Sequence, residues 1–137
     1  MKKIFTLLMT LLIITSCQLK SDKSLTKIIE TKIKDNPTKI DLTSIDKLDY
    51  DKLLILEPYS NIEKTQTELN VDLSNINGNQ IDLSDRINLL VFLKNNKSIK
   101  ISELNRKNGD FEDYKVIINR ENALFEKDKN GIITLAK

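Results

Sequence analysis

The hydrophobic positions between residues 24 and 36 follow the period of an α-helix. Apolar residues recur there at intervals of three and four, at Leu25, Ile28, Ile29 and Ile33. Ser24 has the side chain of an N-cap, and Pro37 disfavours the α conformation of the residue before it. The sequence therefore predicts a helix from about Ser24 to the residue before Pro37. We expect its apolar stripe to pack on the protein's own sheet, although such a stripe also fits a partner-binding helix.

A continuous apolar run at residues 53–56 predicts a strand that is buried on both faces. Pro58 follows the run, and Ser60 and Glu63 have the spacing of a capping box. A second, shorter helix is expected after Ser60, with Ile62, Thr65 and Leu69 pointing inward.

The rest of the chain alternates between short apolar strands and turn-forming residues. The expected turns are Asn77-Gly78, Asn95-Asn96, Asn108-Gly109 and residues 128–131, between strands near 73–76, 81–83, 89–93, 98–102, 114–118, 123–126 and 132–135. Two early helices followed by such a run of strands predict an α+β fold, with both helices packed on one face of a mostly antiparallel sheet. We expect this domain to cover residues 24–137.

The N-terminal residues have the layout of a secretory signal peptide. Lys2 and Lys3 precede an apolar run at residues 4–14, which is about half the roughly 20 residues that a membrane-spanning helix needs. The segment closes with Ile-Thr-Ser-Cys at residues 14–17 and resembles the lipobox of bacterial lipoproteins.

The resemblance to lipoproteins implies a location and an anchor. Residues 1–16 would be removed as the signal peptide, Cys17 would be diacylated, and residues 17–23 would form a lipidated tether. The protein would then be held in the cell envelope by its lipid. Because Gln18 is not an aspartate, the family pattern implies the outer membrane if the source is Gram-negative.

Composition limits the chemistry of the part that follows the signal peptide. The chain has 22 basic and 20 acidic residues, and the excess is Lys2 and Lys3. The domain is therefore formally neutral, which argues against a nucleic-acid partner. It has no histidine, and its only cysteine is Cys17, so the usual general base, metal ligand and thiol nucleophile are missing. We expect no cofactor and no enzymatic activity.

An asparagine-rich stretch at residues 75–79 resembles part of a calcium-binding loop. The first and last ligand positions of such a loop would be Leu73 and Ser84, where acidic residues are needed. No metal site is expected.

The most distinctive internal segment surrounds the strand at 53–56. An aromatic-Asp-Lys triplet precedes this strand and a Pro-Tyr pair follows it, and a strand-turn at residues 90–97 forms a second signature. The pattern resembles small exported bacterial proteins of uncharacterised function, and it implies a shared fold and no known activity. The candidate interaction residues are Asp49, Tyr50, Asp51 and Tyr59. The plainer interpretation, which we favour, is a strand start and a tyrosine that anchors a loop.

These observations predict a lipid-anchored envelope protein that binds or assists another envelope protein. One alternative is an enzyme acting on envelope polymers through Asp49, Asp51 and Glu57, which are close in sequence. Another is a purely structural lipoprotein.

Overall fold

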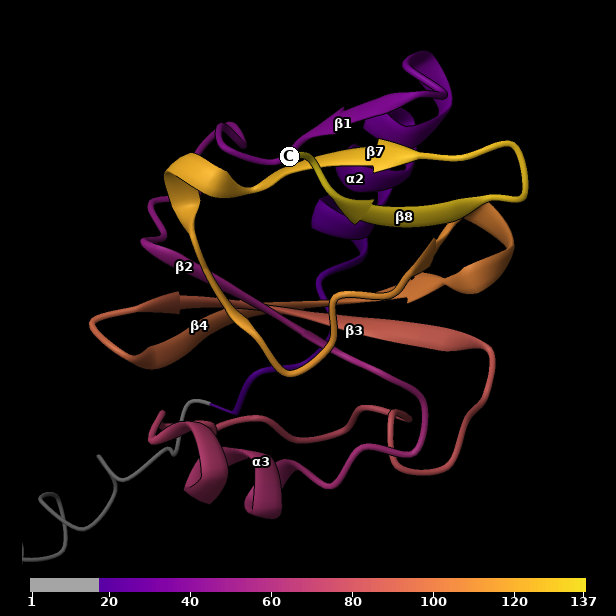
Figure 1. Ribbon diagram of the computed structural model, residues 1–137. Helices are drawn as coiled ribbons and strands as arrows, with labels where there is room; N and C mark the ends of the chain where they lie inside the picture. Colours follow the sequence, from indigo (N-terminus) through magenta and orange to yellow (C-terminus); the bar gives the residue numbers. More distant parts are fainter. Residues whose placement is uncertain (1–17) are drawn as a thin grey trace, which may run out of the picture.

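The computed structural model describes residues 18–137 (Figure 1). The expected signal peptide and Cys17 lie outside the described residues. The elements are α2 (Lys23–Asp35), β1 (Lys39–Asp41), β2 (Lys52–Leu56), α3 (Ile62–Leu69), β3 (Ile87–Lys94), β4 (Lys97–Asn105), the 3₁₀ turn η2 (Arg106–Asn108), β5 (Asp110–Phe111), β6 (Ile117–Asn119), the 3₁₀ turn η3 (Arg120–Asn122), β7 (Leu124–Lys127) and β8 (Ile132–Leu135).

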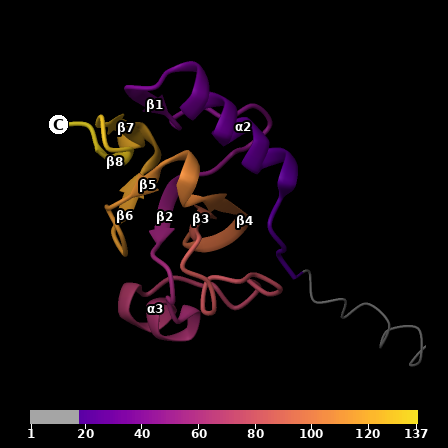
Figure 2. The same ribbon diagram turned by 90° about the vertical axis from the view of Figure 1, so that its right-hand side faces the viewer.

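The described strands form two four-stranded sheets. The central sheet has the order β4-β3-β2-β6 and is antiparallel throughout, whereas the outer sheet has the order β1-β7-β8-β5 and pairs β5 with β8 in parallel. The predicted α+β class is confirmed. The predicted arrangement needs correction, because there are two sheets and the two helices lie on opposite faces of the central one (Figures 1 and 2).

The apolar run in β2 explains this layered arrangement. Leu53 and Ile55 point into a core shared with α2 and the outer sheet, which we call the outer-sheet core. Leu54 and Leu56 point into a second core beneath α3, which we call the α3 core. Successive strand residues face opposite sides, so an unbroken apolar strand needs cover on both faces. The prediction of a strand buried on both sides is confirmed.

Helix α2 begins slightly earlier than the sequence suggested. Its N-cap is Asp22, whose Oδ1 accepts a hydrogen bond of 3.0 Å from the backbone N–H of Leu25. Leu25, Ile29 and Ile33 are buried as expected, whereas Ile28 is 38% exposed. The apolar face of α2 is therefore used mainly within the domain.

The N-cap of helix α3 is also one residue from the expected position, at Asn61 instead of Ser60. Asn61 caps it by accepting a 2.8 Å hydrogen bond from the N–H of Lys64, and the hydroxyl of Ser60 donates instead to the carbonyl of Glu57. Asn70 ends the helix in the left-handed conformation, with φ of 52°. The helix itself is confirmed, because its inward face, centred on buried Thr65, covers the α3 core.

Two predicted hairpins are present and one is not. β3 and β4 meet at Asn95-Asn96, whose φ values of 50° and 60° fit a type I′ turn, and β7 and β8 meet around residues 128–131. The stretch around Asn77-Gly78 forms an irregular loop instead of a hairpin. Ile76 forms a β-bridge with Leu19, so the backbone there pairs with the start of the described chain.

Residues 19–22, expected as part of a tether, are fixed to the domain. The backbone of Leu19 exchanges hydrogen bonds with the carbonyl of Asn75 and the N–H of Asn77, at 2.7 and 3.1 Å. The N–H of Asp22 donates to the carbonyl of Ile101 at 3.0 Å. Residues 19–22 are therefore part of the packed domain, which was expected to start at residue 24.

Candidate functional site

The four candidate residues from the sequence do not form one site. Asp49 is exposed, with 80% of its side chain accessible. Its carboxylate lies 3.1 Å from the amino group of Lys94 and 3.6 Å from the guanidinium of Arg120. Ion pairs this exposed contribute little to stability, so Asp49 is a solvated surface residue.

Tyr50 belongs to the outer-sheet core. Its ring packs edge-to-face on Phe92 with centroids 5.0 Å apart, and its hydroxyl donates to the backbone carbonyl of Leu42. The guanidinium of Arg120 lies 5.2 Å from the ring centroid. Burial raises the pKa of Tyr50 to about 12, so its hydroxyl stays protonated and acts as a structural donor.

Asp51 and Tyr59 lie beyond opposite ends of β2. Asp51 accepts a 3.0 Å hydrogen bond from the N–H of Asn95 and thereby holds the β3–β4 turn, while its buried Oδ1 has no partner within residues 18–137. The side chain of Tyr59 is exposed, and its backbone is in the left-handed conformation, with φ of 62°. The five residues of β2 span about 17 Å at roughly 3.3 Å per residue, so these side chains cannot act together.

The same geometry separates Glu57 from the other two carboxylates of the enzyme alternative. Glu57 pairs with Lys115 at 3.2 Å at the far end of β2 from Asp49 and Asp51. The structure therefore gives no support to a catalytic pair that joins Glu57 to Asp49 or Asp51.

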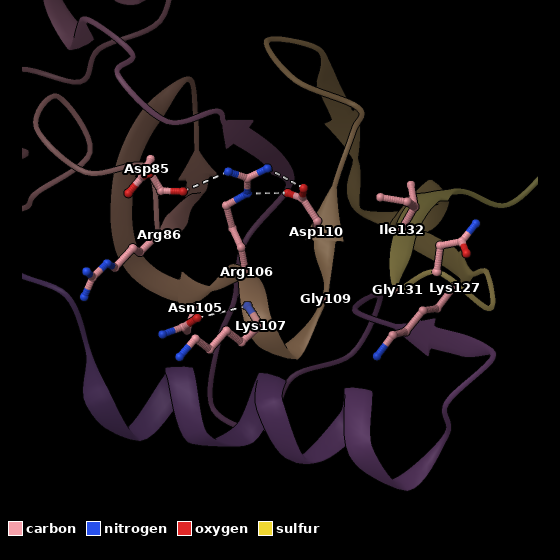
Figure 3. Close-up of a pocket in the computed structure, with 11 residues that line it drawn as sticks. Asp85, Arg86, Asn105, Arg106, Lys107, Gly109, Asp110, Lys127, Gly131 and Ile132 are labelled. Atoms are coloured by element: carbon pink, nitrogen blue, oxygen red, sulfur yellow. Dashed lines mark hydrogen bonds and ion pairs between the residues drawn. The ribbon is translucent and has the colours of Figure 1, made fainter.

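An open pocket of about 630 Å³ lies elsewhere, where the η2–β5 turn faces the β7–β8 hairpin (Figure 3). It is lined by Asp85, Arg86, Asn105, Arg106, Lys107, Gly109, Asp110, Lys127, Asn130, Gly131 and Ile132. These residues come from three separate stretches of the chain, so no local sequence pattern predicted the pocket.

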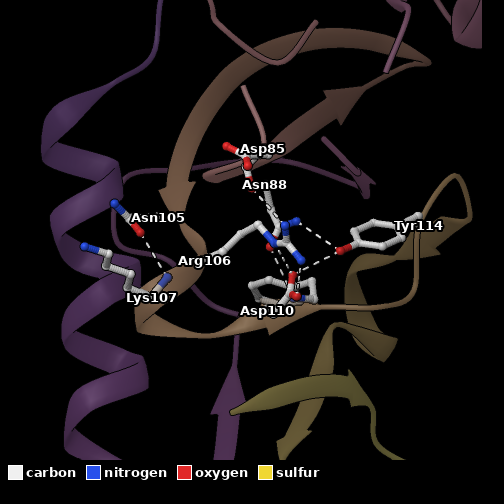
Figure 4. Close-up of polar contacts among 8 residues, drawn as sticks. Asp85, Asn88, Asn105, Arg106, Lys107, Asp110 and Tyr114 are labelled. Atoms are coloured by element: carbon white, nitrogen blue, oxygen red, sulfur yellow. Dashed lines mark hydrogen bonds and ion pairs between the residues drawn. The ribbon is translucent and has the colours of Figure 1, made fainter. Parts of the chain in front are cut away.

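The back of the pocket is built on a paired arginine and aspartate. Arg106 donates from Nε and Nη2 to the two carboxylate oxygens of Asp110, at 2.8 and 2.5 Å, and from Nη1 to the backbone carbonyl of Asp85 at 2.8 Å (Figure 4). Two-pronged pairs of this kind fix both side chains in one geometry. The bond from Arg106 holds the pKa of Asp110 below its ordinary value, and Asp110 in turn raises the pKa of Arg106.

Two further side chains extend this network into the core. The Tyr114 hydroxyl donates to Asp110 at 3.1 Å, and the fully buried Asn88 donates to that hydroxyl at 3.2 Å (Figure 4). Asn88 also accepts from the N–H of Phe111 at 3.2 Å. Burial raises the pKa of Tyr114 to about 12. The network therefore acts as a rigid support for the η2–β5 turn, with its polar groups engaged.

Gly109 lets this turn approach the outer sheet closely. A Cβ at Gly109 would collide with Cδ1 of the fully buried Ile133. The Asn108-Gly109 turn expected from the sequence is present, and the close contact explains why its second residue lacks a side chain.

The front of the pocket carries positive charge without matching carboxylates. Within residues 18–137, Arg86, Lys107 and Lys127 form no ion pair. A second hollow of about 560 Å³ adjoins the pocket and shares Lys107 and Lys127 with it. Clustered cations of this kind can bind anionic groups.

The described residues hold no group of three or more side chains suited to a metal ion. Two asparagines of the calcium-like loop bond within the loop itself: Asn77 accepts from the N–H of Gly78 at 2.7 Å, and Asn79 accepts from that of Ile81 at 3.0 Å. The side chain of Asn75 instead donates to the carbonyl of Ser98 in β4 at 2.8 Å. Between residues 18 and 137, no helix has the length and apolar character needed to cross a bilayer.

Comparison of the chain with protein-family models, with curated proteins and with solved structures gave no match.

Proposed function

We propose that this chain is a lipid-anchored protein of the bacterial cell envelope whose domain binds another envelope component. The observation that carries the proposal is the Ile-Thr-Ser-Cys sequence at residues 14–17, which follows a basic start and a short apolar run. The tertiary arrangement favours a binding role over the carboxylate-enzyme alternative, because Asp49 and Glu57 lie beyond opposite ends of β2.

The docked start of the domain adds a geometric consequence. Only Gln18 separates Cys17 from Leu19, which is hydrogen-bonded to the domain. A fully extended residue spans at most about 3.6 Å, so an acylated Cys17 would hold the domain directly at the membrane surface. A partner must then lie close to the membrane or meet the side of the domain that faces away from it.

The anchor is tested by replacing the acylated residue. Cys17→Ser removes the thiol that would carry the lipid, so the protein should lose incorporation of labelled palmitate and stay as an uncleaved precursor or become soluble. Ser16→Ala keeps a small residue before the cysteine and should be processed like the wild type. Normal cleavage and unchanged detergent partitioning of the Cys17→Ser protein would refute the proposal.

The binding role is tested separately by mild crosslinking of intact cells, followed by affinity capture of the full chain from membranes. We expect the same envelope component to be enriched in repeated captures. Recovery of the protein alone in every repeat would favour a purely structural lipoprotein.

A further inference from the structure

We infer that the two adjoining hollows form a single cationic groove that binds an extended anionic polymer through repeated phosphate or carboxylate groups. The groove is defined by Lys27, Lys34, Arg86, Arg106, Lys107 and Lys127. This assignment names a ligand class for the binding role, and it rests on the proposed function only where it places that polymer in the cell envelope.

The local charge differs from that of the whole domain. Six basic and three acidic residues line the groove, whereas residues 18–137 carry 20 of each. Asp110 is paired with Arg106, so five other basic residues remain beside two other acidic residues. One of these two is Glu30, which accepts a 2.8 Å hydrogen bond from Asn108. The remaining acid is the exposed Asp85. Positive charge is thus concentrated here in a domain that is otherwise balanced, which favours an anionic ligand.

The cations are also held in a continuous arrangement. Lys107 and Lys127 line both hollows, and in Figure 3 their amino groups lie between the pocket and α2. Lys127 is oriented by a 3.0 Å hydrogen bond from its amino group to the carbonyl of Asn108. Arg86 extends the row at one end, while Lys27 and Lys34 of α2 extend it at the other. A ligand with several charges can contact more of this row than a single small ion can.

The lining residues distinguish between classes of polyanion. No aromatic residue is among those that line either hollow. Proteins that bind single-stranded nucleic acids combine basic grooves with aromatic side chains on which bases stack. An anionic glycan or polyphosphate needs no such platform, so the groove fits a polymer recognised by its charge.

The position of the groove favours a polymer as its ligand over the headgroups of the anchoring membrane. The described chain starts on the side of α3 in Figure 1, whereas the β7–β8 hairpin lies at the opposite side, and the turned view in Figure 2 agrees. If the lipid is attached just before this start, the groove faces away from the membrane. An anionic polymer of the envelope can reach it there.

The direct test titrates the full chain, kept in nonionic detergent micelles, with labelled polyphosphate, polygalacturonate and neutral dextran. We expect binding to one or both anionic polymers and none to dextran, and the stronger of the two identifies phosphate or carboxylate as the recognised group. Binding should weaken as salt rises, because exposed charges are screened. Equal binding to dextran, or no binding to either polyanion at low salt, would overturn the inference.

A matched pair of double variants places the binding in the groove. Lys107→Gln with Lys127→Gln should weaken polyanion binding by about 5- to 30-fold, the effect of losing two exposed ionic contacts. Lys64→Gln with Lys97→Gln removes the same charge near α3 and should change binding by less than about twofold, if binding depends on position and not on net charge. Equal losses in both variants would refute a specific groove.

Two further measurements separate the possible failures. Adding phosphatidylglycerol to the micelles should leave polyanion binding unchanged, and full competition would assign the groove to lipid headgroups instead. The full-length Cys17→Ser chain should bind the polymers like the wild type. If the Cys17→Ser chain is cleaved and partitions into detergent like the wild type, the protein is not lipidated and the anchor proposal fails. If that chain still binds the polymers, the groove inference stands.

Discussion

Two arginine–aspartate clusters in this protein have similar compositions and different physical roles. Arg106 and Asp110 share two hydrogen bonds of 2.5 and 2.8 Å, and only 22% of the Asp110 side chain is exposed. Arg120 lies 3.6 Å from Asp49, whose side chain is 80% exposed. The first cluster combines good geometry with partial burial, so we expect it to stabilise the fold, whereas the second pair is dominated by water.

The rest of the Arg120 environment makes the difference clearer. Arg120 donates to the backbone carbonyls of Thr43 and Tyr50, at 2.7 and 3.3 Å, and stacks near the Tyr50 ring. Its role therefore depends on the main chain and the aromatic ring more than on Asp49. The comparison shows that an acidic residue that lies close to other acidic residues in the sequence does not necessarily form the ion pair that stabilises the fold.

The largest expected effect comes from the aromatic pairs that lie under the two clusters. Phe92 packs on Tyr50 with centroids 5.0 Å apart, and Phe111 packs on Phe125 at 5.1 Å, all in the outer-sheet core. Phe92→Ala and Phe111→Ala should each lower the free energy of unfolding by about 3–5 kcal/mol, since each removes a fully buried ring. Denaturant titration followed by circular dichroism measures this, and wild-type stability in either variant would show that its ring does not support the core.

A smaller effect is expected from Asp110→Asn. The amide keeps the shape of the carboxylate but removes the charge that Arg106 pairs with, so we expect a loss of about 1–3 kcal/mol. Asp85→Asn is the control, because Asp85 meets Arg106 through its backbone carbonyl. Equal losses in both variants would mean that the Arg106–Asp110 pair makes no specific contribution to the free energy of unfolding.

The same pair predicts a dependence of stability on pH. The bond from Arg106 lowers the pKa of Asp110 below its ordinary value of 3.8, while burial opposes the shift. Because the folded protein releases this proton more readily than the unfolded chain, the contribution is complete above about pH 4 and is lost as the pH falls through the lowered value. Urea titrations at several acidic pH values should therefore show a shallower decline for Asp110→Asn than for the wild type.

Other carboxyl groups also contribute to the loss of stability at acidic pH, in the wild type and in Asp110→Asn alike. Hydrogen bonds lower the pKa values of Asp22, Asp41, Asp72 and Asp128, whereas burial raises that of Glu103. The Asp110→Asn variant therefore removes one part of the decline and not all of it. Identical slopes in variant and wild type would contradict the assignment.

The smallest effect is expected from Asp49→Asn. Since Asp49 is exposed and its contacts to Lys94 and Arg120 are open to water, the free energy of unfolding should change by less than about 0.5 kcal/mol. A thermal melt beside that of Asp110→Asn checks this. A loss as large as that of Asp110→Asn would remove the contrast between the two clusters and restore interest in Asp49.

Much of the local structure could be predicted from residue patterns. The period of Leu25, Ile29 and Ile33 located α2, and the apolar run at 53–56 located a strand with two buried faces. The Asn95-Asn96 turn was also correct. These features depend on neighbours along the chain, for which side-chain period and turn conformation are sufficient.

The candidate site could not be predicted in the same way. Tyr50 next to Asp49 and Asp51 looked like an exposed cluster, but the strand that follows carries Tyr50 into the core beside Phe92. The expected turns at Asn108-Gly109 and residues 128–131 border the pocket, and the i, i+4 spacing of Arg106 and Asp110 was a further local signal. Its other lining residues come from the start of β3 and from the β7–β8 hairpin.

By itself the sequence determined the helices, most strands, the balance of charge and the absence of histidine and of thiols after Cys17. Only the tertiary structure decided that the strands divide into two sheets, that α2 and α3 cover opposite faces of one of them, and that distant lysines and arginines line two adjoining hollows. The physical reason is one of range. Hydrophobic period and turn chemistry act over a few residues, whereas strand pairing and the neutralisation of charges depend on which distant segments the two cores bring together.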